Sequence, residues 1–139
     1  MKIHHIGIYS KNIAKTVARY KQFFSNISIS KIFVDKIFNV KIIFIKNKND
    51  IIYEFIEPLG KKKNIFSSIK KNQSSIHHLA YEVNNLEKEV KRLRRNGYFQ
   101  IKPILYSVAL KTKITFLIND DCVLIELIQA KPKVVFSKI

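Results

Sequence analysis

Four histidines stand as two adjacent pairs, and one glutamate follows each pair at a matching distance. The phrase IHH occurs at 3–5 and again at 76–78, and these two copies hold every histidine of the chain. Glu54 follows His5 by 49 residues, and Glu126 follows His78 by 48. Imidazole nitrogens and carboxylate oxygens are ligands for borderline divalent ions. The matched spacing therefore indicates equivalent placement of two metal-ligand candidates in each half of the chain.

Strand alternation selects one histidine of each pair. Successive side chains of a strand point to opposite faces, so His5 would share a face with Gly7, and His78 would share a face with Ala80. A very small residue thus stands two places beyond each of these histidines and leaves room beside the imidazole. The second histidine of each pair would face the other way, and we interpret it as a packing or supporting residue. These two residues are His4 and His77.

Both glutamates lie in runs that are apolar on both sides of a sheet. Glu54 stands in IIYEFI and Glu126 in VLIELI, and a carboxylate buried in such a run costs several kcal/mol unless it is paired, hydrogen-bonded or metal-bound. If the halves pack about a pseudo-twofold axis, the two histidines and two glutamates would form one set for Zn, Co, Ni, Mn or Fe. The alternative is a relic of duplication, with histidines bonded to backbone and glutamates paired with lysines.

The similarity of the halves extends over most of the chain and predicts their elements. A shift of 73 residues aligns IHHIGIYSKNIAKTVARY with IHHLAYEVNNLEKEVKRL, and a shift of 72 aligns the segments 41–56 and 113–128. Each half reads as strand, helix, short strand and hairpin. The sequence therefore predicts one α+β domain over 1–139, with βαβββ modules at 1–57 and 76–130, a connector at 58–75 and a curved, mixed eight-stranded sheet around a metal-binding cup.

Each predicted helix carries an apolar face and a start signal. The apolar positions recur at i, i+4 and i+7 of one helical face. They are Ile13, Val17 and Tyr20 in the first half, and Leu86, Val90 and Leu93 in the second. Asn12 and Asn85 stand where a helix N-cap is wanted, and Gly97 stands where the second helix should end. We therefore expect both helices to begin directly after an asparagine.

The charge is strongly positive, but the composition supplies a simple cause. Lys and Arg number 26 against 10 acidic residues, for a net charge of +16. Such a charge attracts nucleic acid, yet 22 of the 26 are lysines and the chain is rich in Ile and Asn, as an AT-rich genome would give. The basic residues of the second helix are interpreted as a solvated face. No apolar run reaches the length of a membrane span, and the single cysteine and the absence of a signal segment favour the cytoplasm.

The motifs HHIGI, YEFIEPLG, HHLAYEV and VLIELIQ resemble those of the vicinal oxygen chelate superfamily, which includes glyoxalase I and bleomycin-resistance proteins. Nearly the whole chain takes part, and within the superfamily the methylmalonyl-CoA epimerases look most similar. The resemblance implies one divalent metal ion as cofactor. Its ligands would be His5, Glu54, His78 and Glu126, with Glu54 where many epimerases have glutamine.

For catalysis, the resemblance implies removal of a proton from the carbon next to a thioester, which needs a base on each side of that carbon. Epimerases place an acidic residue shortly before the third strand, but here that position holds Ile37. Asp35 lies two residues away and could substitute, or it could be a solvated loop carboxylate. Glu126 could act as both ligand and base. Asp35 and Glu126 are therefore the candidate catalytic residues.

Three functions stay open at this point. The first is a metal-dependent isomerase, epimerase-like, or a glyoxalase I-like lyase, acting on an acyl-CoA, another acyl thioester or a similar carbonyl compound. The second is a non-catalytic module that binds a small molecule or confers resistance with the same cup. The third is a basic partner-binding protein, for RNA for example, whose affinity would fall steeply with salt. A homodimer is also expected, because the resembled family often forms dimers and an edge strand of this chain could pair across a twofold axis.

Overall fold

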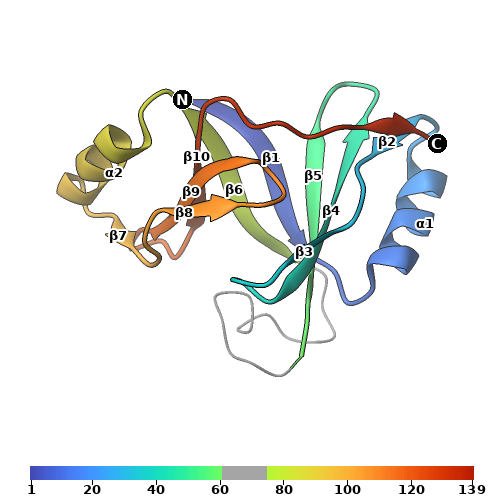
Figure 1. Ribbon diagram of the computed structural model, residues 1–139, viewed down its shortest axis with the longest axis horizontal. Coiled ribbons are helices and arrows are strands. Elements are labelled where there is room, and N and C mark those ends of the chain that lie inside the picture. The colour runs from blue at the N-terminus through green and yellow to red at the C-terminus, as the bar shows by residue number, and fades with distance from the viewer. Residues whose placement is uncertain (61–74) are drawn as a thin grey trace. The chain divides into compact units, whose positions relative to one another are not determined.

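The computed structural model describes residues 1–60 and 75–139, and within them it contains two helices and eleven strands in mixed parallel and antiparallel pairing. The α+β fold class predicted from the sequence is confirmed (Figure 1). The chain divides into two compact units. The α1 unit comprises His5–His77 and Val135–Ile139, and the α2 unit comprises Met1–His4 and His78–Val134. Most of the connector predicted at 58–75 lies outside the described residues.

The α1 unit contains helix α1 (Ile13–Phe23) and the larger part of strand β1 (Lys2–Tyr9). Its other strands are β2 (Ile27–Ile29), β3 (Phe33–Asp35), β4 (Val40–Asn47), β5 (Ile52–Pro58) and the C-terminal β11 (Ser137–Lys138). The strand order is β11-β2-β4-β5-β1, and β3 also pairs with β4. Among the described strands of this unit, only β1 and β5 run parallel.

The α2 unit repeats this plan with helix α2 (Leu86–Arg95) and the larger part of strand β6 (Ile76–Val83). Its other strands are β7 (Phe99–Gln100), β8 (Leu105–Ser107), β9 (Thr112–Ile118) and β10 (Leu124–Gln129). The strand order is β6-β10-β9-β7, and β8 also pairs with β9. β6 and β10 run parallel, as β1 and β5 do in the α1 unit.

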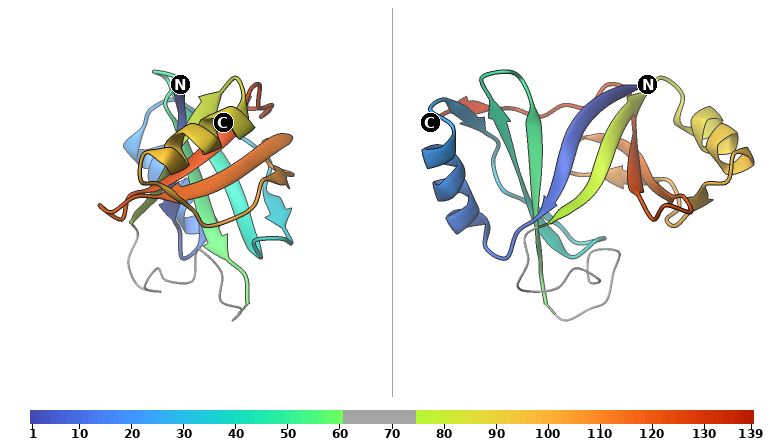
Figure 2. Two further views of the ribbon diagram at one scale, coloured as in Figure 1. Left: turned by 90° about the vertical axis from the view of Figure 1, so that its left-hand side faces the viewer. Right: turned by 180° about the vertical axis from the view of Figure 1, so that it is seen from behind.

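Each helix packs its apolar face on one side of the strands of its own unit (Figure 2). In the α1 unit, Ile13 joins a cluster with Ile43, Ile45 and Phe55, against which Val17 and Tyr20 are partly buried. In the α2 unit, the predicted apolar face of the helix forms the corresponding cluster. Its buried members are Val83, Leu86, Val90, Leu93, Leu117 and Leu127. Since each such side chain contributes about 1.5–3 kcal/mol on burial, these clusters fix one face of the strands against the helix.

The sheet has more strands than the eight that the sequence predicts. The run before each hairpin forms two short strands, β2 and β3 in the α1 unit and β7 and β8 in the α2 unit. The C-terminal strand β11 is a further strand, which pairs with β2. In the α1 unit, Ile29 pairs with Ile45 but Phe33 pairs with Ile42, so four steps along one strand face three along the other. This extra residue is a bulge, which bends a strand. The second break includes Pro103, which lacks a backbone donor for the ladder.

The predicted helix boundaries are confirmed at both N-termini. Asn12 Oδ1 accepts a hydrogen bond from the backbone N–H of Lys15, and Asn85 Oδ1 accepts one from that of Lys88, both at 3.0 Å. Gly97 has a φ of +87°, the left-handed conformation expected just beyond the end of α2. Among residues 1–60 and 75–139, neither helix is long and apolar enough to cross a membrane.

The N-cap of α2 can be tested by replacement. Asn85→Ala removes the acceptor for the Lys88 N–H, and we expect the free energy of unfolding to fall by about 1 kcal/mol. Urea unfolding followed by circular dichroism measures this loss. Asn84→Ala is the matched control, because the Asn84 side chain is exposed and makes no hydrogen bond with the described residues. Equal losses in the two variants would contradict the capping role.

Candidate functional site

The α1 unit buries one histidine against one glutamate. His5 Nε2 lies 3.2 Å from Glu54 Oε2, and only 1% and 4% of these residues are exposed. On the parallel strand β1, Gly7 stands in register with Glu54. On β4, Phe44 stands opposite Glu54, and its ring meets the His5 imidazole edge-on with centroids 5.6 Å apart. The pair is thus bordered by an aromatic ring on one strand and by a residue without a side chain on another.

The α2 unit builds the same arrangement from its own strands. His78 Nε2 lies 2.9 Å from Glu126 Oε2, and each residue is 2% exposed. Ala80 stands in register with Glu126 on β6, and Phe116 stands opposite it on β9. The Phe116 ring meets the His78 imidazole edge-on with centroids 5.4 Å apart. The matched sequence spacing therefore corresponds to matched local geometry within each unit.

Side chains alternate between the two faces of a strand, so one strand can carry both a buried polar group and a residue of the apolar cluster under the helix. In β5, Glu54 alternates with Phe55, which belongs to the apolar cluster under α1. In β10, Glu126 alternates with Leu127, which belongs to the cluster under α2. The helix therefore covers the apolar face, and the histidine–glutamate pair lies on the opposite face of the same strands.

The donor atoms fit metal ligation. Protein ligands of zinc lie about 2.0–2.2 Å from the ion, so two of them are about 3.0 Å apart at a right angle and about 3.4 Å apart at a tetrahedral angle. The observed separations of 3.2 and 2.9 Å match one edge of such a coordination polyhedron. A hydrogen bond between imidazole and carboxylate has the same length. Each pair accordingly offers one nitrogen and one oxygen that could hold a metal ion.

Asp35, the predicted second catalytic residue, is 2% exposed at the end of β3. The alternative expectation of a solvated loop carboxylate is therefore wrong. Its Oδ1 accepts hydrogen bonds from the backbone N–H groups of Ile37 and Phe38, at 2.9 and 3.1 Å. The carboxylate thus holds the turn between β3 and β4, a structural role that the sequence did not reveal. Ile37, at the position where the resemblance to epimerases implies an acid, is 60% exposed.

Asp35 shares a face with the pair of the α1 unit but lies well along the strand from it. Asp35 stands opposite Val40, whereas Glu54 stands opposite Phe44. These two positions on β4 are four residues apart, or about 13 Å along the strand. The catalytic role of Asp35 stays a prediction, and it would need a substrate that extends over this distance.

Sequence reasoning missed a second pair of equivalent residues, which support the site strands from the helix side. Glu57 Oε2 accepts a hydrogen bond from the N–H of Ile13 at 2.9 Å, and Gln129 Oε1 accepts one from that of Leu86 at 2.9 Å. Each lies three residues beyond the buried glutamate and on the opposite face of its strand. The first turn of each helix is thereby bound to the strand that carries the glutamate. The signal was present in the motif, since Glu57 and Gln129 align at the 72-residue shift.

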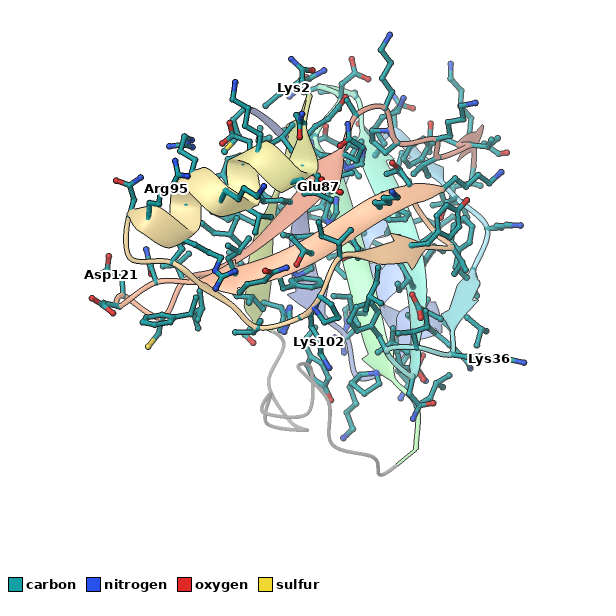
Figure 3. The ribbon with its side chains drawn as sticks, turned by 60° about the vertical axis from the view of Figure 1, so that its left-hand side comes forward. Lys2, Lys36, Glu87, Arg95, Lys102 and Asp121 are labelled. Carbon is teal, nitrogen blue, oxygen red and sulfur yellow. The ribbon has the colours of Figure 1, made fainter. Side chains whose placement is uncertain are left out.

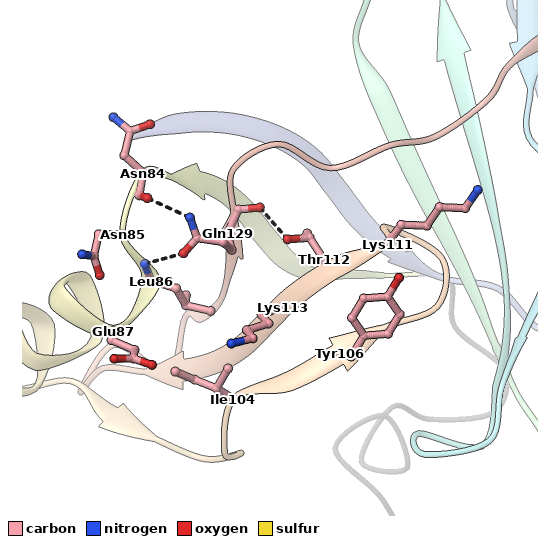
Figure 4. A pocket seen from close by; sticks show the side chains of 10 residues that line it. All are labelled: Asn84, Asn85, Leu86, Glu87, Ile104, Tyr106, Lys111, Thr112, Lys113 and Gln129. Atoms are coloured by element: carbon pink, nitrogen blue, oxygen red, sulfur yellow. Dashed lines mark hydrogen bonds between the residues drawn. The ribbon is translucent and has the colours of Figure 1, made fainter.

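Figure 4 shows Gln129 in a groove of about 570 Å³ beside the N-terminus of α2. The Gln129 Nε2 donates to the Asn84 carbonyl at 2.7 Å, and Thr112 Oγ1 donates to the Gln129 carbonyl at 3.0 Å. The groove also exposes Lys111 and Lys113. None of its lining residues belongs to the predicted site.

The predicted basic face of α2 is exposed. Arg95 projects at the end of the helix, whereas Lys2 lies on β1, Lys36 in the turn after β3 and Lys102 between β7 and β8 (Figure 3). The exposed basic residues of α2 itself are Lys88, Lys91, Arg92, Arg94 and Arg95. Basic residues thus occur on α2, on β1 and in two connecting segments, which agrees with a generally basic surface.

A family model matches residues 4–116, from the first histidine pair to the aromatic residue beside His78. The model is that of the glyoxalase/bleomycin resistance protein/dioxygenase superfamily. The chain belongs to this superfamily. Membership confirms the resemblance drawn from the motifs, and it covers both histidines and the first of the two glutamates that are paired in the structure.

Within this superfamily, the chain is similar to methylmalonyl-CoA epimerases. It is 26% identical over 132 residues to the human mitochondrial methylmalonyl-CoA epimerase, which covers 93% of this chain and 74% of the relative. The epimerase of Mycobacterium tuberculosis superposes with a TM-score of 0.81 at 19% identity, covering 94% of this chain and 89% of that one. A variant of the Streptomyces coelicolor epimerase in complex with 2-nitronate-propionyl-CoA gives 0.78 at 21%, covering 94% and 99%. These structures establish an epimerase-like fold.

The contribution of Phe116, the ring beside the histidine–glutamate pair of the α2 unit, can be tested by measuring protein stability. Phe116→Ala removes a ring that is 2% exposed, and we expect the free energy of unfolding to fall by about 3–5 kcal/mol because a cavity replaces it. Phe99→Ala, in the edge strand of the same unit and 62% exposed, is the control and should cost less than about 1 kcal/mol. Denaturant unfolding compares the two variants. Similar costs would mean that Phe116 does not support the core beside His78.

Proposed function

We propose that the chain is a metal-dependent isomerase that acts on an acyl thioester, with methylmalonyl-CoA as the first candidate substrate. In this proposal His5, Glu54, His78 and Glu126 together bind one divalent ion, which is Zn, Co, Ni, Mn or Fe. The observation that supports it most strongly is the buried histidine–glutamate pair, built once in each unit with the same register. If the repeat were only a relic of duplication, nothing would require both histidine–glutamate pairs to stay buried at the spacing of metal ligands.

The chemistry follows from the groups in each unit. A bound divalent ion would polarise the carbonyl and carboxylate oxygens of the substrate and so acidify the hydrogen on the carbon between them. Burial of both pairs excludes water and strengthens electrostatic interactions with a bound substrate. Glu126 is proposed to act as ligand and as base, and Asp35 to serve the other side of the carbon. The similarity to epimerases supports this reaction, and one relative is bound to an acyl-CoA analogue.

A second candidate function is a small-molecule binding or resistance protein that uses the same residues without catalysis. The position of Asp35 favours it, because this carboxylate holds two backbone amides of a turn. The residue at the family's usual acid position is Ile37, which cannot accept a proton. A glyoxalase I-like lyase is the related enzymatic alternative.

The cytoplasmic location and the homodimer stay predictions.

Metal content tests the ligand set. The native chain, purified without an affinity tag and loaded with divalent metal, should retain about one equivalent after dialysis, whereas His78→Ala should retain little because it lacks one ligand. His77→Ala is the matched control, since the neighbouring histidine alternates to the other face of β6. Plasma emission spectrometry measures the metal in each protein. Equal metal in His77→Ala and His78→Ala, or none in the native chain, would refute the metal site.

Hydrogen exchange tests the reaction. Methylmalonyl-CoA incubated in D2O with the loaded native chain should gain deuterium at the carbon next to the thioester, as mass spectrometry would show. Glu126→Gln should slow this exchange by a factor of about 100 or more, because it removes a base and a ligand. Glu87→Gln, an exposed change of equal charge on α2, should leave the rate unchanged. Binding of the thioester by the native chain without any exchange would favour the non-catalytic candidate.

A further inference from the structure

The α2 unit carries one more acid on the face of its histidine–glutamate pair. Glu82 lies on β6 and shares strand parity with His78 and Ala80. Its register partner on β10 is Ile128, two residues beyond Glu126. Partners in parallel strands point to the same face, so Glu82 and Glu126 lie on the same side of the sheet. The sequence analysis did not single out this residue.

The spacing of the two acids suits a small group bound between them. Glu126 stands opposite Ala80, and Glu82 is two residues further along β6, or about 7 Å. By the same measure Asp35 is about 13 Å along its strand from Glu54. Of the two candidates for an additional base, Glu82 is therefore much closer to the glutamate of its own unit.

The carboxylate of Glu82 is available for such a role. The residue is half-buried, and no hydrogen bond or ion pair joins its side chain to any residue in 1–60 or 75–139. Its partner Ile128 is fully buried, and Ile114, next across on β9, is 4% exposed. An acid bordered by apolar side chains has no structural partner to explain it in the described part of the chain.

The other acids of the described residues have tasks or places that exclude them from this face. Glu57 binds the first turn of α1, Glu89 pairs with Arg92, and Asp50 pairs with Lys46. Two more, Asp120 and Asp121, lie in the turn between β9 and β10, and Glu87 is exposed on α2. Glu82 is the acid that the α2 unit places on the same face as its pair without another contact.

We propose that Glu82, in place of Asp35, is a catalytic base for the isomerisation, acting on one face of the substrate carbon next to the thioester while Glu126 serves the other face. This inference rests on the proposed function. The Glu82 carboxylate takes the proton, the electron pair of the broken C–H bond forms the second C–C bond of the enolate, and the π pair of the thioester carbonyl moves to its oxygen. Protonated Glu126 then gives its proton to the opposite face of that carbon, and the oxygen pair re-forms the carbonyl, which completes the inversion. No oxidant or reductant is needed. In the reverse direction Glu82 returns the proton to the face from which it took it.

The test compares Glu82→Gln with Glu87→Gln and the native chain, all loaded with metal. Each enantiomer of methylmalonyl-CoA is incubated separately in D2O, and early deuterium gain is measured by mass spectrometry. Glu82→Gln should slow exchange by a factor of about 100 or more from one enantiomer, with a much smaller effect on the other. Metal content and the affinity for 2-nitronate-propionyl-CoA, an anion from which no proton must be removed, should match the native values.

Other outcomes overturn the inference in distinguishable ways. Native exchange rates from both enantiomers in Glu82→Gln would exclude a base at this position while leaving the proposed function intact. A parallel loss of metal or of nitronate binding would make Glu82 a structural or binding residue. A loaded native chain that exchanges neither enantiomer would refute the proposed function and the inference with it.

Discussion

The buried contact between an imidazole and a carboxylate is the constraint that organises both units. Neither group can leave water without a partner, and a carboxylate enclosed in an apolar sheet costs several kcal/mol when it is not compensated. Each unit meets this cost in the same way, by aligning histidine and glutamate from two strands within 3.2 Å or less. The parallel pairing of β1 with β5 and of β6 with β10 supplies that alignment, and the small residues Gly7 and Ala80 leave space beside it.

The duplication reaches the details of the backbone that hold these strands in place. Residues 1–60 and 75–139 include four non-glycine residues with positive φ, which form two pairs separated by 72 residues, Asn39 with Lys111 and Asp50 with Cys122. Asn47 and Asn119 each accept two backbone N–H groups within their hairpin turns. Turn geometry sets hairpin register, and a slip of one residue would move every side chain to the other face. Equivalent turns therefore keep Glu54 and Glu126 facing away from their helices.

Sequence reasoning could predict whatever depends on periodicity and on repetition. The helices and their caps, the hairpins and the burial of the two histidine–glutamate pairs all follow from alternation and from the 72- and 73-residue shifts. It could not predict the breaks between β2 and β3 and between β7 and β8, because a bulge depends on the partner strand. It also could not assign Asp35, whose carboxylate is buried by a turn that forms only when β3 pairs with β4.

The two units differ at positions outside the histidine–glutamate pairs. Asp35 in one corresponds by the 72-residue shift to Ser107 in the other, and the Ser107 hydroxyl also accepts a backbone N–H of its turn. Tyr9, which is 6% exposed, corresponds by the 73-residue shift to Glu82. If the two pairs bind a metal ion, as proposed, every ligand position requires a donor of the right type, so both copies must keep histidine and glutamate. The proposed base needs only to reach one face of the substrate, so one copy is free to supply an acid where the other buries a ring. If the two halves of a duplicated fold came to handle opposite faces of one carbon, we would therefore expect them to keep the same ligands and to differ in their other acidic residues.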